Sequence, residues 1–222
     1  MRPIGLRTSD GVQIAAAEAG AGARGVVLVH ELGRQGMCGW WDYAAYLSTR
    51  GFHVLLFDHR CVGDSGCPAG GNDRNGLMSD IDTAGRFLRL HGARKLVLIG
   101  ASQGASEALI AGAIPRPRID GVVALSADEL ELPLTAPPYP PTARAAAPKL
   151  RLPAMLAVEA ADRYVSVHDT RRLVAGINSR DKRLIELPAG AGHGWNLVAT
   201  DGSGKRPPLS DTVVAFLRRV TT

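Results

Sequence analysis

Short, continuous apolar runs alternate with segments of helical spacing along most of the 222-residue chain. The runs at 25–30, 52–57 and 95–99 are rich in Val, Leu, Ile and Phe, which is typical of parallel strands covered on both faces. In the intervening segments, apolar residues recur every three to four positions, as on one face of a helix. The alternation predicts a three-layer α/β fold, with a mostly parallel sheet and helices on both of its faces.

The same reasoning gives the expected extent of each element. We expect strands at 12–16, 25–30, 52–57, 95–99, 119–125, 154–158 and 182–187. We expect helices at 40–50, 80–90, 102–113, near 168–177 and at 212–220. The sheet should therefore contain about seven to eight strands.

The length of the chain suits one domain, because a chain of this size can bury roughly 70% of its unfolded surface in a single core. One segment interrupts the alternation: residues 131–148 contain six prolines, which exclude a central strand or a regular helix. We predict one domain over residues 1–222, in which 127–149 is a short connection, or a flap over a pocket, in place of a cap domain. No apolar run approaches the roughly 20 residues of a membrane-spanning helix.

Charge and cysteine content bear on partners and compartment. The formal net charge of +5 comes from scattered Lys and Arg without a basic patch, so nucleic acid is not an expected partner. The chain has three cysteines, Cys38, Cys61 and Cys67, an odd number whose spacing is not that of metal ligands. We expect free thiols in a reducing compartment, with a Cys61–Cys67 bridge as the alternative. Because the amino terminus also lacks the apolar stretch of a secretory signal, we expect a cytoplasmic protein that has no contact with a membrane.

The segment Gly100-Ala-Ser-Gln-Gly104 matches the pattern G-x-S-x-G. It follows an apolar strand-like run and precedes an Ala-rich helical segment, which is the strand–turn–helix setting that this pattern requires. A serine in such a tight turn projects its hydroxyl from the sheet, and the start of the helix directs backbone N–H groups toward developing negative charge. We interpret Ser102 as a nucleophile; the alternative is a Gly-rich turn without chemistry.

A serine hydroxyl needs a positioned base. His193 is the best candidate, because it lies in a Gly-rich loop (189–195) just after the last expected strand. A loop histidine bonded only to backbone remains the alternative. The base in turn needs a carboxylate that orients it. Asp162 follows the strand at 154–158 and is preferred, Asp128 is a competitor, and Glu159 is interpreted as structural.

The order Ser102, Asp162, His193, each after a successive strand, resembles the α/β-hydrolase superfamily over nearly the whole chain. Two further stretches support the resemblance: 29–33 (Val-His-Glu-Leu-Gly) at the place of the family's oxyanion loop, and 58–65 at its Asp-x-Arg-Gly-x-Gly-x-Ser turn. The resemblance implies a Ser102–His193–Asp162 triad. It also implies an oxyanion hole formed by the backbone N–H groups of Gln103 and Leu32.

Two positions depart from the family pattern. Cys61 replaces the usual Gly, so the turn at 58–65 must tolerate a side chain. Glu31 replaces the usual Gly of the oxyanion loop and places a carboxylate near the nucleophile. We expect Glu31 to form a salt bridge with a cation such as Arg34 or Arg60; alternatively it tunes Ser102 or repels anionic substrates. A similar Glu occurs in dienelactone hydrolases, which use a cysteine nucleophile.

The sequence thus predicts hydrolysis of a carboxylic ester or thioester of small to medium size through an acyl-enzyme, without a metal or organic cofactor. Glu31 and Trp195 are expected to line the substrate pocket, whereas Trp40 and Trp41 are expected to pack a helix against the sheet. Two alternatives remain open. One is a dienelactone-hydrolase-like or peptidase-like activity on the same scaffold. The other is a lyase or ligand-binding protein that keeps the fold, since fold alone does not determine the reaction. The oligomeric state is not predicted.

Overall fold

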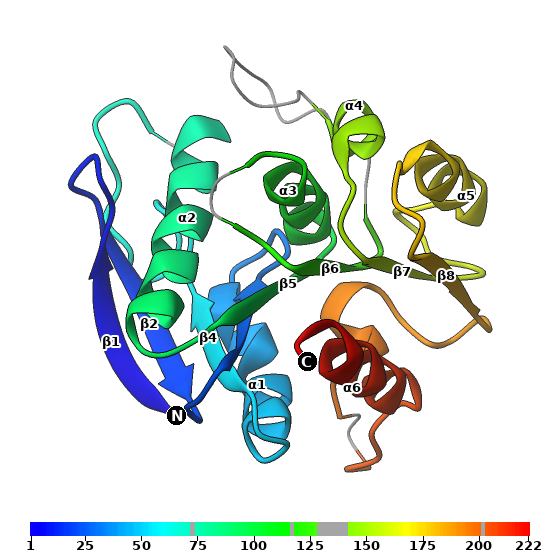
Figure 1. Ribbon diagram of the computed structural model, residues 1–222, viewed down its shortest axis with the longest axis horizontal. Helices are drawn as coiled ribbons and strands as arrows, with labels where there is room; N and C mark the ends of the chain where they lie inside the picture. The colour runs from blue at the N-terminus through cyan, green and yellow to red at the C-terminus, as the bar shows by residue number, and fades with distance from the viewer. Residues whose placement is uncertain (72–73, 116–117, 128–141, 201–202) are drawn as a thin grey trace.

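The computed structural model describes residues 1–71, 74–115, 118–127, 142–200 and 203–222. Within these ranges the chain forms one sheet of eight strands in the order β1-β2-β4-β3-β5-β6-β7-β8 (Figure 1). The first two strands are antiparallel to their neighbours, and all pairs from β4 to β8 are parallel. The fold class predicted from the apolar alternation is therefore confirmed.

The strands are β1 (Arg2–Arg7), β2 (Gln13–Ala19), β3 (Arg24–Val29), β4 (His53–Phe57), β5 (Lys95–Ala101), β6 (Gly121–Leu125), β7 (Ala154–Glu159) and β8 (Lys182–Leu187). The helices are α1 (Trp41–Ser48), α2 (Arg74–Leu90), α3 (Gln103–Gly112), α4 (Ala143–Ala146), α5 (Val167–Gly176) and α6 (Leu209–Val220). Each predicted strand and helix is present, with ends that shift by a few residues.

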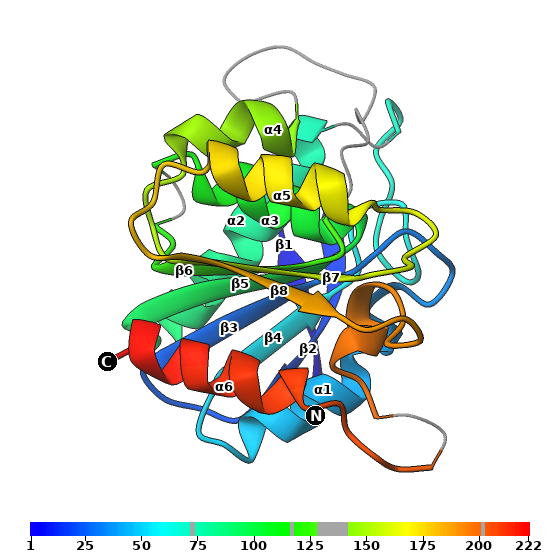
Figure 2. The ribbon, with the colours of Figure 1, turned by 90° about the vertical axis from the view of Figure 1, so that its right-hand side faces the viewer.

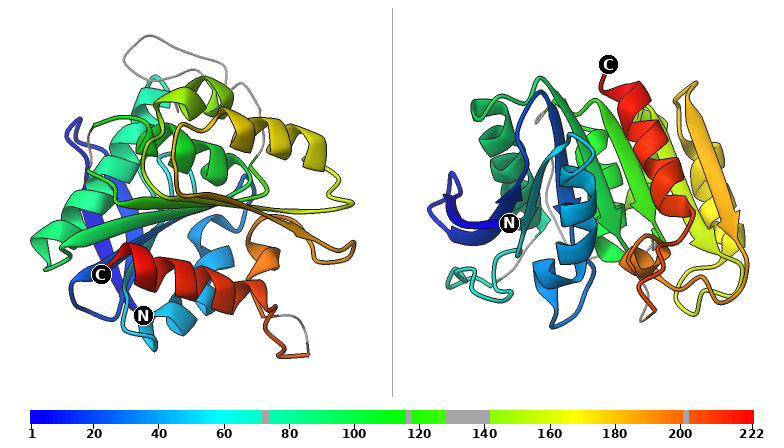
Figure 3. Two further views of the ribbon diagram at one scale, coloured as in Figure 1. Left: turned by 45° about the vertical axis from the view of Figure 1, so that its right-hand side comes forward. Right: turned by 90° about the horizontal axis from the view of Figure 1, so that it is seen from below.

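The helices cover both faces of the sheet. Figure 2 shows α2, α3, α4 and α5 above the strands and α1 and α6 below them, and Figure 3 shows the lower pair lying across the sheet from two further directions. Side chains of the central strands alternate between the two layers. In β5, for example, Leu96 and Leu98 pack with the upper helices, whereas Val97 and Ile99 pack with the lower ones. This two-sided burial explains why the central strands are continuously apolar.

The edge strand β1 was not predicted from the sequence. Its six residues, Arg-Pro-Ile-Gly-Leu-Arg, contain two apolar side chains, and only Leu6 is buried. A strand at the edge of a sheet pairs on one side and needs little apolar surface, so periodicity cannot detect it. Likewise α2 begins several residues before the expected position 80.

The Pro-rich connection predicted at 127–149 lies mostly outside the described residues, as does Asp128. In its described part, residues 143–146 form the one-turn helix α4 and 147–149 a 3-10 helix. The Thr142 hydroxyl caps α4 by accepting the Ala145 N–H at 3.1 Å. This part of the segment therefore packs as short helical turns against α3 and α5.

The expectation of three free thiols is wrong. Cys61 and Cys67 form a disulfide, because the tight turn between them brings their Cα atoms to 4.3 Å, while Cys38 is free and exposed. The bridge removes the argument for a reducing compartment that the cysteines had supplied. In the part of the chain that the structure describes, none of the helices combines the length and apolar character needed to cross a bilayer.

Candidate active site

Ser102 occupies the sharp turn between β5, which ends at Ala101, and α3, which begins at Gln103. Its backbone adopts φ 50° and ψ −118°, a conformation that costs a non-glycine residue about 1–3 kcal/mol. The Ser102 N–H donates to the carbonyl of Leu125 on the neighbouring strand at 2.9 Å. The strained turn is thus held by the sheet on one side and by the helix on the other.

The two glycines of the G-x-S-x-G segment are required by close backbone contacts. A Cβ at Gly100 would lie 2.0 Å from the carbonyl oxygen of Gly104. A Cβ at Gly104 would lie 2.4 Å and 2.5 Å from the carbonyl oxygens of His30 and Val29. The glycines therefore allow the turn to fold on itself and allow the start of α3 to touch the end of β3.

The structure brings His193 to Asp162. The Nδ1 atom of His193 lies 2.9 Å and 2.8 Å from the two carboxylate oxygens of Asp162. The same carboxylate accepts the backbone N–H groups of Tyr164 at 2.9 Å and Val165 at 3.2 Å, and the hydroxyl of Ser126. Burial opposes ionisation of Asp162, but the hydrogen bonds from Tyr164, His193 and Ser126 outweigh it and lower the carboxyl pKa. Asp162 is therefore held as an anion that can keep the proton of His193 on Nδ1.

Ser126, at the end of β6, links the aspartate to the histidine loop. It is fully buried at a positive φ of 51°, and its Oγ accepts the N–H of Gly194 at 3.1 Å while its hydroxyl donates to Asp162. Ser126 was not among the residues predicted from the sequence. It is one serine after an apolar strand, and its partner Gly194 lies 68 positions away, so nothing local signals the contact.

Glu159, interpreted from the sequence as structural, holds the loop that carries His193. The side chain is buried at the end of β7, and its Oε1 accepts the N–H of Gly190 at 2.8 Å. Its Oε2 accepts the N–H of Gly192. One carboxylate thus satisfies two donors of a loop whose glycines adopt positive φ angles, 91° and 101°.

The loop that carries His193 also meets the turn that carries Ser102. A Cβ at Gly194 would lie 3.4 Å from the Cβ of Ala101, so the residue after His193 is in contact with the residue before Ser102. The two loops lie at the carboxyl ends of β8 and β5, the edge at which open α/β sheets bind ligands. The predicted catalytic residues therefore come from loops that meet at one edge.

The predicted oxyanion donors lie beside the same turn. Gln103 is the first residue of α3, so its N–H has no acceptor within the helix. Leu32 lies in the loop after β3, is 63% exposed, and is two residues after His30, whose carbonyl lies close to Gly104. Both N–H groups thus belong to segments packed against each other at the start of α3.

Comparison with known proteins identifies the family. Residues 26–207 match the family model described as the alpha/beta hydrolase fold. The chain belongs to the α/β-hydrolase family. No protein among those with curated functions matches the sequence.

Solved structures of α/β hydrolases share the whole architecture at low sequence identity. An esterase from Pyrococcus furiosus is 16% identical with a TM-score of 0.79, and the match covers 100% of this chain and 91% of that one. A thermophilic esterase from Thermogutta terrifontis is 17% identical with a TM-score of 0.76, over 100% of both chains. A monoacylglycerol lipase from Paleococcus ferrophilus is 21% identical with a TM-score of 0.71, over 94% of this chain and 98% of that one.

The α/β-hydrolase turn at 58–65 accommodates its departure from the family pattern. Cys61 adopts a positive φ of 65°, the conformation for which the usual glycine is suited, and is bonded to Cys67. The carboxylate of Asp58 accepts the N–H of Met37 at 2.6 Å and fills the space that a Cβ at Gly63 would need. The turn therefore tolerates the cysteine and braces the loop that follows β3.

The expected salt bridge of Glu31 is absent. Among the described residues Glu31 pairs with neither Arg34 nor Arg60. Arg60 instead forms ion pairs with Asp10 at 2.7 Å and Asp80 at 2.9 Å. The guanidinium of Arg60 is thus engaged by two other carboxylates.

Glu31 lies instead against the histidine loop. Its carboxylate accepts the N–H of Trp195, and its Oε2 is buried beside Gly194 without a hydrogen-bond partner in the described residues. Burial raises the pKa of this carboxyl, and the charge of Asp162 adds to the rise, while His193 and the Trp195 N–H oppose it. An incompletely paired carboxylate therefore faces the predicted catalytic histidine.

Glu31 and Trp195 line one surface pocket of about 400 Å³, together with residues 32–35 and Asn196.

The three tryptophans differ in burial. The Trp195 ring is largely buried, and its centre lies 6.1 Å from the centre of the Trp40 ring. Trp40 is fully buried in the lower core layer, whereas Trp41 is 42% exposed. Trp40 therefore packs in the core beneath the sheet as expected, whereas Trp41 is not part of that core. Within the described ranges, no group of three or more His, Cys, Asp or Glu side chains is placed to bind a metal ion.

Proposed function

We propose that this α/β hydrolase cleaves a carboxylic ester or thioester through an acyl-enzyme on Ser102. The observation that carries the proposal is the convergence of two loops at one sheet edge. One presents a serine on a strained turn at a helix start, and the other presents a histidine bonded to a buried aspartate. Nucleophile, base and orienting acid are the three parts that acyl transfer at neutral pH requires.

In the acylation step, the Ser102 oxygen attacks the carbonyl carbon and His193 Nε2 accepts the hydroxyl proton. Asp162 keeps the other ring proton on Nδ1 and stabilises the imidazolium. The negative charge on the carbonyl oxygen is stabilised by the N–H groups of Gln103 and Leu32. Collapse of the tetrahedral intermediate expels the alcohol or thiol, which takes the proton from His193.

In the deacylation step, water takes the place of the leaving group. His193 accepts a proton from water, the resulting hydroxide equivalent attacks the acyl carbon, and the second tetrahedral intermediate uses the same N–H groups. The carboxylic acid leaves as Ser102 recovers its proton from His193. Each cycle therefore consumes one ester and one water and leaves the protein unchanged.

A surface pocket beside the two loops supports small to medium soluble substrates. Its lining does not include Ser102 or His193, but it contains Glu31, whose carboxylate lies against Gly194 next to His193. Its volume of about 400 Å³ is near the lower end for pockets that bind small molecules. Glu31 lines it with a carboxylate that has no cation partner in the described residues, which disfavours anionic substrates. We propose that 127–149 replaces a cap domain as a short connection. The neighbours named as esterases from Pyrococcus furiosus and Thermogutta terrifontis act on this class of bond.

The proposal is tested with p-nitrophenyl esters of graded chain length and with a fluorophosphonate probe. The wild type should hydrolyse short-chain esters, and mass spectrometry should find one probe adduct on Ser102. Ser102→Ala should abolish both, while Ser9→Ala, at an exposed serine in a turn, should change neither. A folded wild type that neither hydrolyses any ester nor accepts the probe would be a binding protein on this fold. Activity that rises steadily toward long chains would contradict the pocket size.

A further inference from the structure

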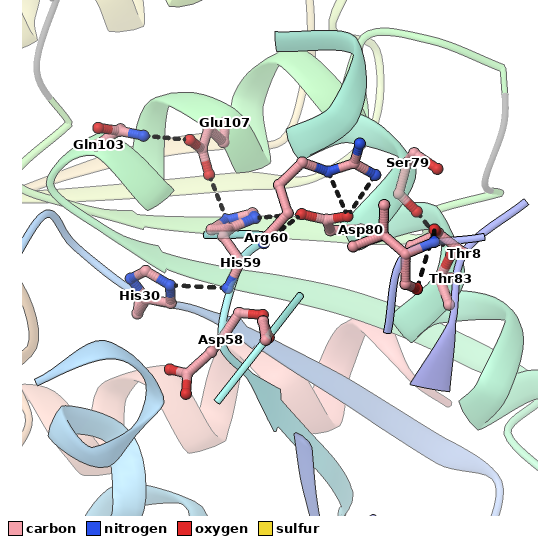
Figure 4. Close-up of polar contacts among 12 residues, drawn as sticks. Thr8, His30, Asp58, His59, Arg60, Ser79, Asp80, Thr83, Gln103 and Glu107 are labelled. Carbon is pink, nitrogen blue, oxygen red and sulfur yellow. Dashed lines mark hydrogen bonds and ion pairs between the residues drawn. The ribbon is translucent and has the colours of Figure 1, made fainter. Parts of the chain in front are cut away.

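Side chains from the end of β4, from α2 and from α3 form a buried charged cluster (Figure 4). At its centre is His59, which follows β4 and is almost fully buried. Its Nδ1 lies 3.3 Å from Asp80 Oδ2, and its Nε2 lies 2.8 Å from Glu107 Oε2 in an ion pair. The function proposed above makes no use of His59.

One arm of the cluster reaches the first oxyanion donor. Glu107 lies one turn along α3 from Gln103, and its Oε1 accepts the side-chain N–H of Gln103 at 2.6 Å. Gln103 supplies the backbone N–H next to Ser102. The ion pair between His59 and Glu107 therefore anchors the first turn of α3, whose peptide orientation determines where this N–H points.

The other arm reaches the second donor. The backbone N–H of His59 donates to His30 Nε2 at 3.1 Å, so that nitrogen carries no proton. The proton is therefore on Nδ1, which donates to the carbonyl oxygen of Glu31 at 2.7 Å. This carbonyl and the Leu32 N–H belong to the same planar trans peptide and point in opposite directions. A fixed Glu31 carbonyl thus aims the Leu32 N–H away from His30.

The charges hold this arrangement in place. Burial opposes the protonated form of His59, but Glu107 and Asp80 outweigh it and raise its pKa to about 9. Burial, with the nearby charge of His59, lowers the pKa of His30 to about 4, so its Nε2 remains an acceptor at neutral pH. Arg60 completes the cluster, because it binds the far side of Asp80 through Nε at 3.0 Å and Nη2 at 2.9 Å.

We propose that His59 is a positioning residue that aligns both backbone donors of the oxyanion hole. Its ring acts through Glu107 on the Gln103 segment, and its backbone N–H acts through His30 on the Glu31–Leu32 peptide. The inference rests on the function proposed above, because an oxyanion hole has a role only if Ser102 forms a tetrahedral intermediate.

Two conservative variants of His59 separate alignment from stability. In His59→Gln the amide N–H takes the place of Nε2 and can still donate to Glu107. In His59→Asn the amide N–H takes the place of Nδ1 and can donate only to Asp80. With p-nitrophenyl acetate, we expect kcat to fall about tenfold or more in His59→Asn but only about threefold in His59→Gln, with KM unchanged in both.

A matched pair at His30 tests the second arm if either His59 variant fails to fold. His30→Asn keeps a donor for the Glu31 carbonyl, whereas His30→Gln keeps only an acceptor for the His59 N–H. We expect kcat to fall about tenfold more in His30→Gln than in His30→Asn. The inhibition constant of a trifluoromethyl ketone, whose hemiketal oxygen occupies the hole, should rise in each variant by the same factor as kcat falls.

The outcomes distinguish the two proposals. If the wild type hydrolyses esters but the folded Asn and Gln variants at each site have equal kcat, or if KM changes instead of kcat, only the positioning role is wrong. If the wild type neither hydrolyses esters nor accepts the fluorophosphonate on Ser102, the proposed function is wrong and the positioning role falls with it. The expected order of kcat with matching inhibition constants would support both.

Discussion

The contact between Glu159 and the histidine loop gives a prediction whose size follows from its geometry. The buried carboxylate accepts one N–H with each oxygen, and hydrogen bonds to a charged group contribute roughly 1.5–3 kcal/mol each. Glu159→Gln keeps one acceptor, turns an NH₂ donor toward the other backbone N–H, and removes the charge. We therefore expect the loop around His193 to lose about 2 kcal/mol of local stability, and kcat to fall about 30-fold.

The assay combines ester hydrolysis with hydrogen exchange at Gly190 and Gly192. We expect kcat to fall, KM to stay constant and exchange to accelerate at these two amides. Glu186→Gln, on the neighbouring strand β8, is the matched control, because its partner Arg171 is exposed and the pair is screened by solvent. The control should change none of the three quantities. Wild-type kcat in Glu159→Gln, despite faster loop exchange, would refute the idea that Glu159 aligns the base.

Three further predictions concern other parts of the account. Gly100→Ala should fail to fold as shown by circular dichroism, because its Cβ would meet the Gly104 carbonyl at 2.0 Å; a folded, active variant would contradict the geometry of the turn. Glu31→Gln should raise kcat/KM for p-nitrophenyl hemisuccinate roughly 20-fold relative to the neutral butyrate, since a unit charge about 10 Å away at an effective dielectric of 20 contributes roughly 1.7 kcal/mol. An unchanged ratio would exclude a role in charge selection. The pKa of His59 is raised to about 9, so protonation of this residue should stabilise the fold fully below pH 6.5. About 3 kcal/mol of this stability should be lost as the pH rises to 9. Denaturant unfolding should show this decline in the wild type and a flatter pH profile in His59→Gln.

The central strands and the helices that cover them could be predicted from the sequence, because burial determines where apolar residues recur along each element. The strand that ends at Ala101, the turn at Ser102 and the helix that follows form one local unit, and their pattern was sufficient to predict the strand–turn–helix that carries the candidate nucleophile. His193 and Asp162 could be selected because each follows a strand end in a parallel sheet. Their hydrogen bond then depends only on the usual order of strands in this fold.

The remaining features depend on distances between segments, which a single sequence does not encode locally. Ser126 accepts a hydrogen bond from Gly194, 68 residues away in the sequence. Cys61 and Cys67 form a disulfide because the turn between them brings them together. Among the described residues Glu31 pairs with neither expected cation, and one of them, Arg60, is held by two other carboxylates. The expectation failed because partner choice among charges is a property of the folded arrangement.

The central claim is that the imidazole of His193 removes the proton of the Ser102 hydroxyl. The most direct measurement is the second-order rate constant for phosphonylation of Ser102 in His193→Ala relative to the wild type, with both proteins shown to be folded. The account predicts a fall of about 1,000-fold or more, because the hydroxyl alone is a weak nucleophile. A rate constant within about threefold of the wild type would mean that another group activates the serine, and the proposed mechanism would be wrong.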